Sequence, residues 1–251
     1  MPNTANLIFA AFLISGSVSA ARLSPAASRA FQEYAANFEA RITQRNYTPV
    51  GSLRIEPVHG GTWPVPDALL HDWRGSTVAP DVSAAEMLAL LRDCRDLPKW
   101  YAPEVQSCTL LARQGDVSRV LIRFQKRNVA VVTLDAEYEV TTHALGPHAG
   151  YERSVSTHIW EIDNPGTPRE RRRPEGNDDG FLWRLNSYWT FAEVSGGLLI
   201  ECEAVSLTRD VPTGLNWLAA PIIAQLPRQS LEFTLNATAK ALLANRKETH
   251  R

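Results

Sequence analysis

Six stretches in which apolar and polar residues alternate follow one another between residues 107 and 207. They span residues 107–112, 119–125, 129–141, 151–162, 181–193 and 198–207. Alternation with a period of two is typical of β-strands that bury one face, and short turns between neighbouring strands favour antiparallel pairing. We therefore expect an antiparallel meander of six strands.

After residue 212 the apolar period becomes helical. One apolar stripe contains Leu215, Leu218, Ile222 and Leu226, and a second contains Leu231, Leu235 and Leu242. Pro227 separates the two stripes, and a proline inside a helix removes a backbone hydrogen bond. The pattern predicts one long C-terminal helix that is bent or interrupted at Pro227.

The first part of the chain is more mixed. Residues 25–45 carry apolar side chains at helical spacing, and residues 68–78 are expected to form a strand. Ser83 followed by Glu86 has the spacing of a capping box and predicts the start of a second helix. The segment 48–66 is rich in proline and contains a Gly-Gly pair, which is typical of a linker or an irregular packing segment.

The N-terminus resembles an export signal. Residues 7–14 (LIFAAFLI) form an apolar run that is too short to span a bilayer, and small residues follow it up to Ala21. Residues 1–6 contain neither lysine nor arginine. We expect a signal peptide over 1–21 and an exported protein, periplasmic or secreted. The alternative is a buried N-terminal helix or an uncleaved anchor.

The three cysteines match no zinc-binding pattern. In an oxidising compartment Cys94 and Cys108 are expected to form a disulfide that closes a short loop. Cys202 lies in an apolar alternating stretch and is expected to be a small core residue. The alternative is three buried free thiols.

Charge excludes one class of partner. The chain has 26 Lys+Arg against 27 Asp+Glu, so it lacks the basic excess of nucleic-acid-binding proteins. Basic residues cluster at 169–173, and acidic residues follow them. We interpret this segment as a solvated loop whose charges largely cancel. The alternative is a transient contact with phosphate groups or membrane headgroups.

Three features together resemble a known family. They are the order of elements over residues 66–245, the passage 97–105 (LPKWYAPEV), and the pair 187–191 (SYWTF) and 196–202 (GGLLIEC). They resemble the START-like, polyketide cyclase/dehydrase superfamily, which includes the birch-pollen-allergen-like proteins. This resemblance implies an α+β helix-grip fold, in which a curved antiparallel sheet wraps around a long C-terminal helix.

The expected organisation follows from this fold. The signal peptide (1–21) precedes an N-terminal helix and linker (22–65), the START-like domain (66–245) and a short tail (246–251). The N-terminal helix is additional to the minimal helix-grip pattern. The resemblance implies a cavity between sheet and C-terminal helix that holds a hydrophobic small molecule, such as a lipid, a quinone or a polyketide-like compound.

Alternation selects the side chains expected to line this cavity. The aromatic candidates, expected to share one apolar space, are Tyr138, Trp183, Trp189 and Trp217. Ser187 and Ser206 are the small residues expected beside them. Core packing is the alternative for each aromatic side chain.

The strand at 151–162 is evenly mixed, so alternation alone does not decide which of its faces is buried. One choice places Arg153 and Thr157 in the cavity as polar anchors. The other places Ser154, Ser156 and His158 there.

Signatures of catalysis are few. The chain has neither a Gly-x-Ser-x-Gly elbow nor a glycine-rich nucleotide loop, and its six histidines form no visible metal-binding cluster. We therefore expect no cofactor and no metal. The three acidic residues Asp135, Glu137 and Glu139 alternate along one strand, and we expect them to lie on a solvated outer face. The sequence favours a non-catalytic carrier. The alternative is a cyclase- or dehydratase-like enzyme that acts on a hydrophobic chain in the same cavity.

Overall fold

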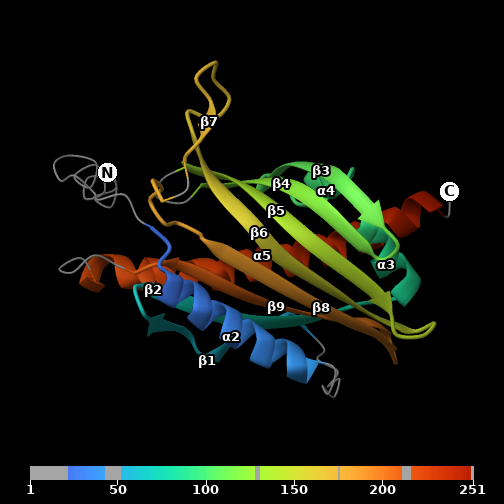
Figure 1. The fold of residues 1–251 in the computed structure, drawn as a ribbon. Helices are drawn as coiled ribbons and strands as arrows, with labels where there is room; N and C mark the ends of the chain where they lie inside the picture. Colours follow the sequence, from blue (N-terminus) through green and yellow to red (C-terminus); the bar gives the residue numbers. More distant parts are fainter. Residues whose placement is uncertain (1–21, 43–51, 128–130, 175, 211–215, 250–251) are drawn as a thin grey trace, which may run out of the picture.

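The computed structural model describes residues 22–42, 52–127, 131–174, 176–210 and 216–249 (Figure 1). In chain order the elements are α2 (Pro25–Ile42), β1 (Arg54–Val65), β2 (Ala68–Ala79), α3 (Ala84–Arg92), α4 (Leu97–Trp100), β3 (Val105–Gln114), β4 (Val117–Arg127), β5 (Val131–Ala144), β6 (Ala149–Asp163), β7 (Arg171–Arg172), β8 (Arg184–Val194), β9 (Gly197–Arg209) and α5 (Asn216–Thr249). The signal peptide expected over 1–21 lies outside the described residues. Within the described ranges, no helix has the length and apolar character needed to cross a membrane.

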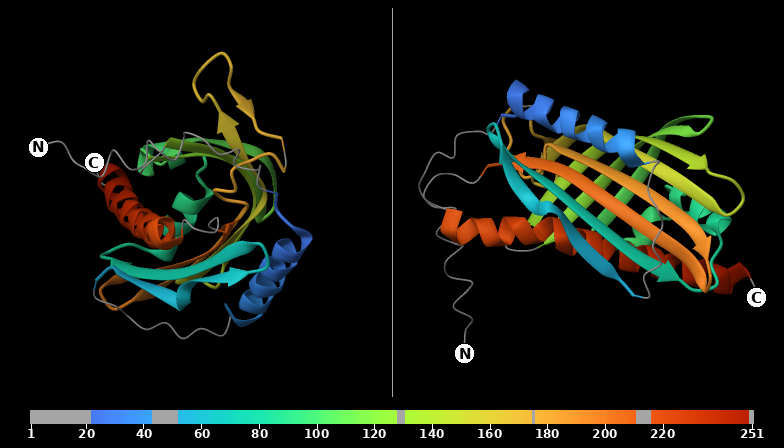
Figure 2. Two further views of the ribbon diagram at one scale, coloured as in Figure 1. Left: turned by 90° about the vertical axis from the view of Figure 1, so that its left-hand side faces the viewer. Right: turned by 90° about the horizontal axis from the view of Figure 1, so that it is seen from below.

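The strands form one antiparallel sheet in the order β1-β2-β9-β8-β6-β5-β4-β3, with the short β7 paired to β6. The sheet is strongly curved, and α5 lies on its concave side (Figure 2). We call the face towards α5 the inner face and the opposite one the outer face. This is the expected α+β helix-grip fold, and all six strands of the expected meander are present.

Helix α5 packs against β1, β2 and β9, and also against α3 and α4. Gly75 on β2 permits the close approach, because a Cβ atom there would lie 2.4 Å from Leu235 Cδ1 and 2.7 Å from Ile55 Cδ1. The helix continues through Pro227, so the expected interruption is wrong. Burial of Leu231, Leu235 and Leu242 against the rest of the fold offsets the proline penalty of about 3 kcal/mol.

The segment 54–65, expected to be irregular, is the edge strand β1. An edge strand needs backbone donors on one side only, so it tolerates Pro57 and Pro64. Gly60 and Gly61 adopt positive φ angles of 84° and 81° at the register shift between Pro57 and Thr62. The prolines and glycines that suggested a linker therefore mark a bulged edge strand.

Helix α2 covers the outer face of β2, β8 and β9 (Figures 1 and 2). Its apolar side chains, including Phe31 and Phe38, pack against Leu70, Val205 and Leu207. The expected capping box at the start of α3 is confirmed. Ser83 Oγ accepts from the Glu86 amide, and the Glu86 carboxylate accepts from the Ser83 amide.

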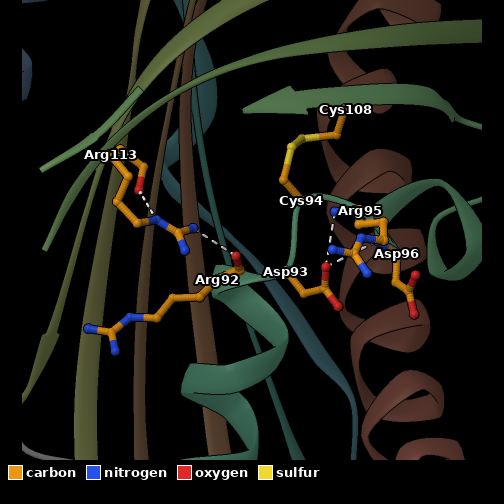
Figure 3. Close-up of a disulfide and its surroundings, with 8 residues drawn as sticks. Arg92, Asp93, Cys94, Arg95, Asp96, Cys108 and Arg113 are labelled. Carbon is orange, nitrogen blue, oxygen red and sulfur yellow. Dashed lines mark hydrogen bonds between the residues drawn. A yellow bond between two sulfur atoms is a disulfide. The ribbon is translucent and has the colours of Figure 1, made fainter. Parts of the chain in front are cut away.

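A disulfide joins Cys94, just after α3, to Cys108 on β3 (Figure 3). Their Cα atoms are 5.4 Å apart. Beside it, Asp93 Oδ1 accepts from the Arg95 amide (3.0 Å), and Arg113 Nη2 donates to the Arg92 carbonyl (2.9 Å). The connection between α3 and α4 is thus tied to an edge of the sheet. Cys202 is a buried free thiol, as its pattern predicts.

The basic segment forms an arm around β7 that projects from the sheet (Figure 1). Three of its four arginines form ion pairs: Arg171 pairs with Asp163, Arg172 Nε lies 3.1 Å from Asp135 Oδ2, and Arg173 Nε lies 2.6 Å from Asp163 Oδ1. Asp135 is on the outer face but is buried, because Arg123 and Arg172 cover it. The expectation that Asp135 is solvated is therefore wrong.

Candidate functional site

The candidate site is the inner face of the sheet where it passes α5. Backbone pairing places Ser154 of β6 beside Ser187 of β8, then Ala204 of β9, then Trp73 of β2. We call these four residues the central row. Three have small side chains, and Ser187, Ala204 and Trp73 remain partly exposed although they lie on the concave side. The inner face is therefore not fully covered along this row, and we call this uncovered strip the hollow.

Apolar clusters border the central row on both sides. On one side Trp189 and Cys202 pack with α3 and with Leu231 and Leu235 of α5. On the other side Tyr138 packs with Val120, Ala136 and partly buried neighbours that include Leu185. Tyr138 and Trp189 thus share the inner face, as expected, but they belong to two clusters that the central row separates.

Of the other two aromatic candidates, one lies elsewhere and the other is outside the described side chains. Trp183 packs under α2 with Ala27 and Phe31, on the outer face, and its Nε1 donates to Asp178 Oδ1 at 3.0 Å. Its expected place in the cavity is wrong, because β8 begins at Arg184 and alternation does not extend to the bend before it. Trp217 lies in α5, but its side chain is outside the described part of the chain.

The structure also decides between the two faces of β6. Arg153 lies on the outer face, where its Nε is 2.9 Å from Glu39 Oε1 of α2. Thr157 is exposed and donates to the Glu137 carbonyl at 3.2 Å, next to a register shift between β5 and β6. Neither side chain reaches the inner face, which corrects their placement in the cavity. The alternative set supplies Ser154 and Ser156, both buried, whereas His158 is exposed.

Ser206 lies at the far end of the inner face beside His71. The two ring nitrogens of His71 form hydrogen bonds of 2.9 Å with Thr62 Oγ1 and Thr208 Oγ1. Burial lowers the pKa of His71 to about 4, so the imidazole is neutral at pH 7. This group is a closed polar network that needs no further partner.

Glu152 is the inner-face residue that sequence reasoning missed. It is 5 % exposed and lies between Thr142 of β5 and Trp189 of β8. Its carboxylate accepts hydrogen bonds from Thr142 Oγ1 (3.0 Å) and Ser154 Oγ (3.3 Å). Burial raises its pKa to about 7, although both hydrogen bonds and the positive charge of Arg92 act in the opposite direction. Side chains two positions apart on a strand share a face, so any sequence evidence that Ser154 and Ser156 face inward would have placed Glu152 there too.

Two further polar atoms on this face are buried without a hydrogen-bond partner among the described residues. They are the Tyr138 hydroxyl and Trp73 Nε1. Buried polar atoms are rarely left unpaired, because each costs about 1–3 kcal/mol. Both flank the hollow, which therefore offers polar contacts as well as apolar walls.

The described residues offer no obvious place for a metal: none of their His, Cys, Asp and Glu side chains form a group of three or more suited to one. A separate open recess of about 400 Å³ lies at the start of α3. Its acidic side chains all make contacts that stabilise the fold. Glu86 caps α3, Glu193 accepts a hydrogen bond from the Ala84 amide, and Asp81 forms an ion pair with Arg246. It is not the apolar space expected between sheet and helix.

Comparison with known proteins supports the fold. No protein-family model and no curated protein sequence matches the chain. Human STARD10 is similar in structure, with a TM-score of 0.50 and 13% identity over 92% of this chain and 86% of that one. The STAR-related lipid transfer protein from Xanthomonas axonopodis has a TM-score of 0.48 and 17% identity over 76% and 98%. The Zhui aromatase/cyclase from Streptomyces sp. R1128 has a TM-score of 0.46 and 11% identity, over 69% of this chain and 93% of that one. The likeness to STARD10 shows the helix-grip fold, as the sequence predicts.

Proposed function

We propose that this protein binds and carries a hydrophobic small molecule between the inner face of its sheet and α5. The observation that carries the proposal is the central row, whose small side chains leave a hollow on the concave side of the sheet. Trp73 and Trp189 supply apolar surface, and the unpaired Tyr138 hydroxyl and Trp73 Nε1 supply polar contacts. The START-like fold supports this function, since the superfamily includes lipid carriers.

Filling the hollow tests the proposal. Ser187→Trp places an indole in the central row and is expected to weaken binding of the neutral dye Nile red at least tenfold, measured by fluorescence titration. Thr157→Trp is the matched control, because the same side chain enters an exposed position on the neighbouring strand β6. If the row were only packed core, Ser187→Trp would instead destabilise the fold by about 1–3 kcal/mol, and the wild-type protein would bind no dye.

Export is part of the proposed function. The apolar run at 7–14 and the small residues after it support a cleaved signal, and a disulfide suits an oxidising compartment. N-terminal sequencing of the protein secreted by its own host is expected to return a chain that starts at or near Ala21. A chain that starts at Met1 or Pro2 would contradict this assignment.

One observation favours an enzyme as a second candidate. A buried carboxyl whose pKa is about 7 can accept and return a proton at neutral pH, and Glu152 lies on the inner face. A cyclase- or dehydratase-like reaction would use such a group. Incubation with a poly-β-ketone separates the two functions, because a carrier returns the compound unchanged and an enzyme converts it.

A further inference from the structure

The Glu152 carboxyl has no basic partner. Among the described residues, no lysine, arginine or histidine lies within ion-pair distance of it. Its two oxygens each accept one hydrogen bond, from Thr142 and from Ser154. A carboxylate can accept about four, so positions for two further donors remain. Ser154 belongs to the central row, so the carboxyl adjoins the hollow.

No described residue packed around Glu152 forms an ion pair with it, although the positive charge of Arg92 acts on the carboxyl from a distance and lowers its pKa. From α3, Arg92 is committed elsewhere, because its Nη2 donates to Asp116 Oδ1 at 2.8 Å and lies 3.5 Å from the Thr142 carbonyl. Just after α4, the Tyr101 hydroxyl is hydrogen-bonded to Thr238 Oγ1. Burial raises the pKa of both Tyr101 and Cys202, the latter on β9, so these groups are neutral at pH 7.

We propose that the bound molecule carries a basic amine, which lies against Glu152 while its hydrophobic body lies along the central row. This inference rests on the proposed function and names the ligand class. An ammonium group supplies both the missing positive charge and the missing hydrogen-bond donors, whereas an alcohol supplies a donor but no charge. A fatty acid or a phosphate would bring a second negative charge to a buried carboxylate.

The aromatic neighbour favours the same class. Trp189 is paired with Glu152 across β6 and β8 and is buried in the cluster beneath α3. The face of an indole ring attracts a cation, so an ammonium group held by Glu152 would have an aromatic neighbour. Carboxylate and indole together select a cation over a neutral headgroup of the same size.

A series of ligands with one chain and three headgroups tests the inference on the full-length protein. Dodecylamine, dodecanol and dodecanoate are titrated by calorimetry at pH 8, below their critical micelle concentrations. Dodecylamine is expected to bind at least tenfold more tightly than dodecanol, and dodecanoate most weakly. Glu152→Gln is expected to reduce the affinity for dodecylamine to that for dodecanol. Glu139→Gln removes an exposed carboxylate from the outer face of β5. It is expected to change neither the affinity for dodecylamine nor that for dodecanol.

The advantage of the amine is also expected to shrink as the pH falls from 8 to 6. Glu152 takes up a proton in this range, since its pKa is about 7, while an alkylamine stays charged. Equal affinities for amine and alcohol, or an advantage that survives Glu152→Gln, overturn this inference and leave the proposed function intact. Failure of all three ligands to bind overturns the proposed function and the inference with it.

Discussion

At pH 8, Glu152→Gln is expected to raise the free energy of unfolding by about 3 kcal/mol. Burial raises the pKa of Glu152 from 4.5 to about 7, so the folded protein binds this proton more tightly than the unfolded chain. Wild-type stability therefore falls as the pH rises from about 4.5 to about 7, and the loss is complete above pH 7. Glutamine has no proton to lose, and its amide oxygen still accepts from Thr142.

Urea denaturation of both proteins at pH 4, 6 and 8 measures this difference. The gap between them is expected to be small at pH 4 and largest at pH 8, with equal denaturant slopes. Glu139→Gln serves as the control, because its exposed carboxylate lies on the opposite face. Parallel pH profiles for wild type and Glu152→Gln would show that the carboxyl is not desolvated. A more stable variant is also a sound protein for the headgroup titrations.

Replacing both Cys94 and Cys108 by serine is expected to cost about 3 kcal/mol of stability. The disulfide joins cysteines 14 positions apart, and opening such a loop returns conformational freedom mainly to the unfolded chain. Thermal or urea unfolding with and without reductant measures the effect. Reductant is expected to destabilise the wild type to the level of the double variant and to leave the variant unchanged.

Peptide mapping under non-reducing conditions supplies the independent check on this bond. Wild-type protein is expected to yield one linked peptide that contains both cysteines. Two free thiols in protein from an oxidising compartment would contradict the pairing. Unfolding that responds to reductant in the double variant as well would assign the effect to a disulfide between two molecules through Cys202, the remaining cysteine.

The sequence predicts the strands well because strand alternation survives in most of them. It fails where the local pattern has two physical explanations. In β1 the prolines and glycines that indicate a linker also suit a bulged edge strand, and only pairing with β2 distinguishes the two. Alternation in β8 places Ser187 and Trp189 on the inner face but misplaces Trp183, which precedes the strand.

The candidate site is harder to predict because side-chain partners come from distant segments. Arg153 is a plausible cavity anchor until α2 brings Glu39 to the outer face, more than a hundred residues away in sequence. Glu152 is the reverse case. A glutamate on a strand ordinarily faces water, and only the register with Thr142 and Trp189 shows that this one is buried.

Helix α2 changes how substitutions in β8, β9 and β2 should be interpreted. In a helix-grip domain without this helix, the outward side chains of these strands would meet solvent. Here Leu70, Val205 and Leu207 are as inaccessible as the residues that face α5. These three strands therefore form the middle layer of three, and their outward side chains beneath α2 do not behave as protein surface. A survey of mutations would find Val205 and Leu207, on the outer face of β9, as intolerant of polar residues as Cys202 on its inner face, whereas the edge strand β3, mostly exposed on both faces, would accept them.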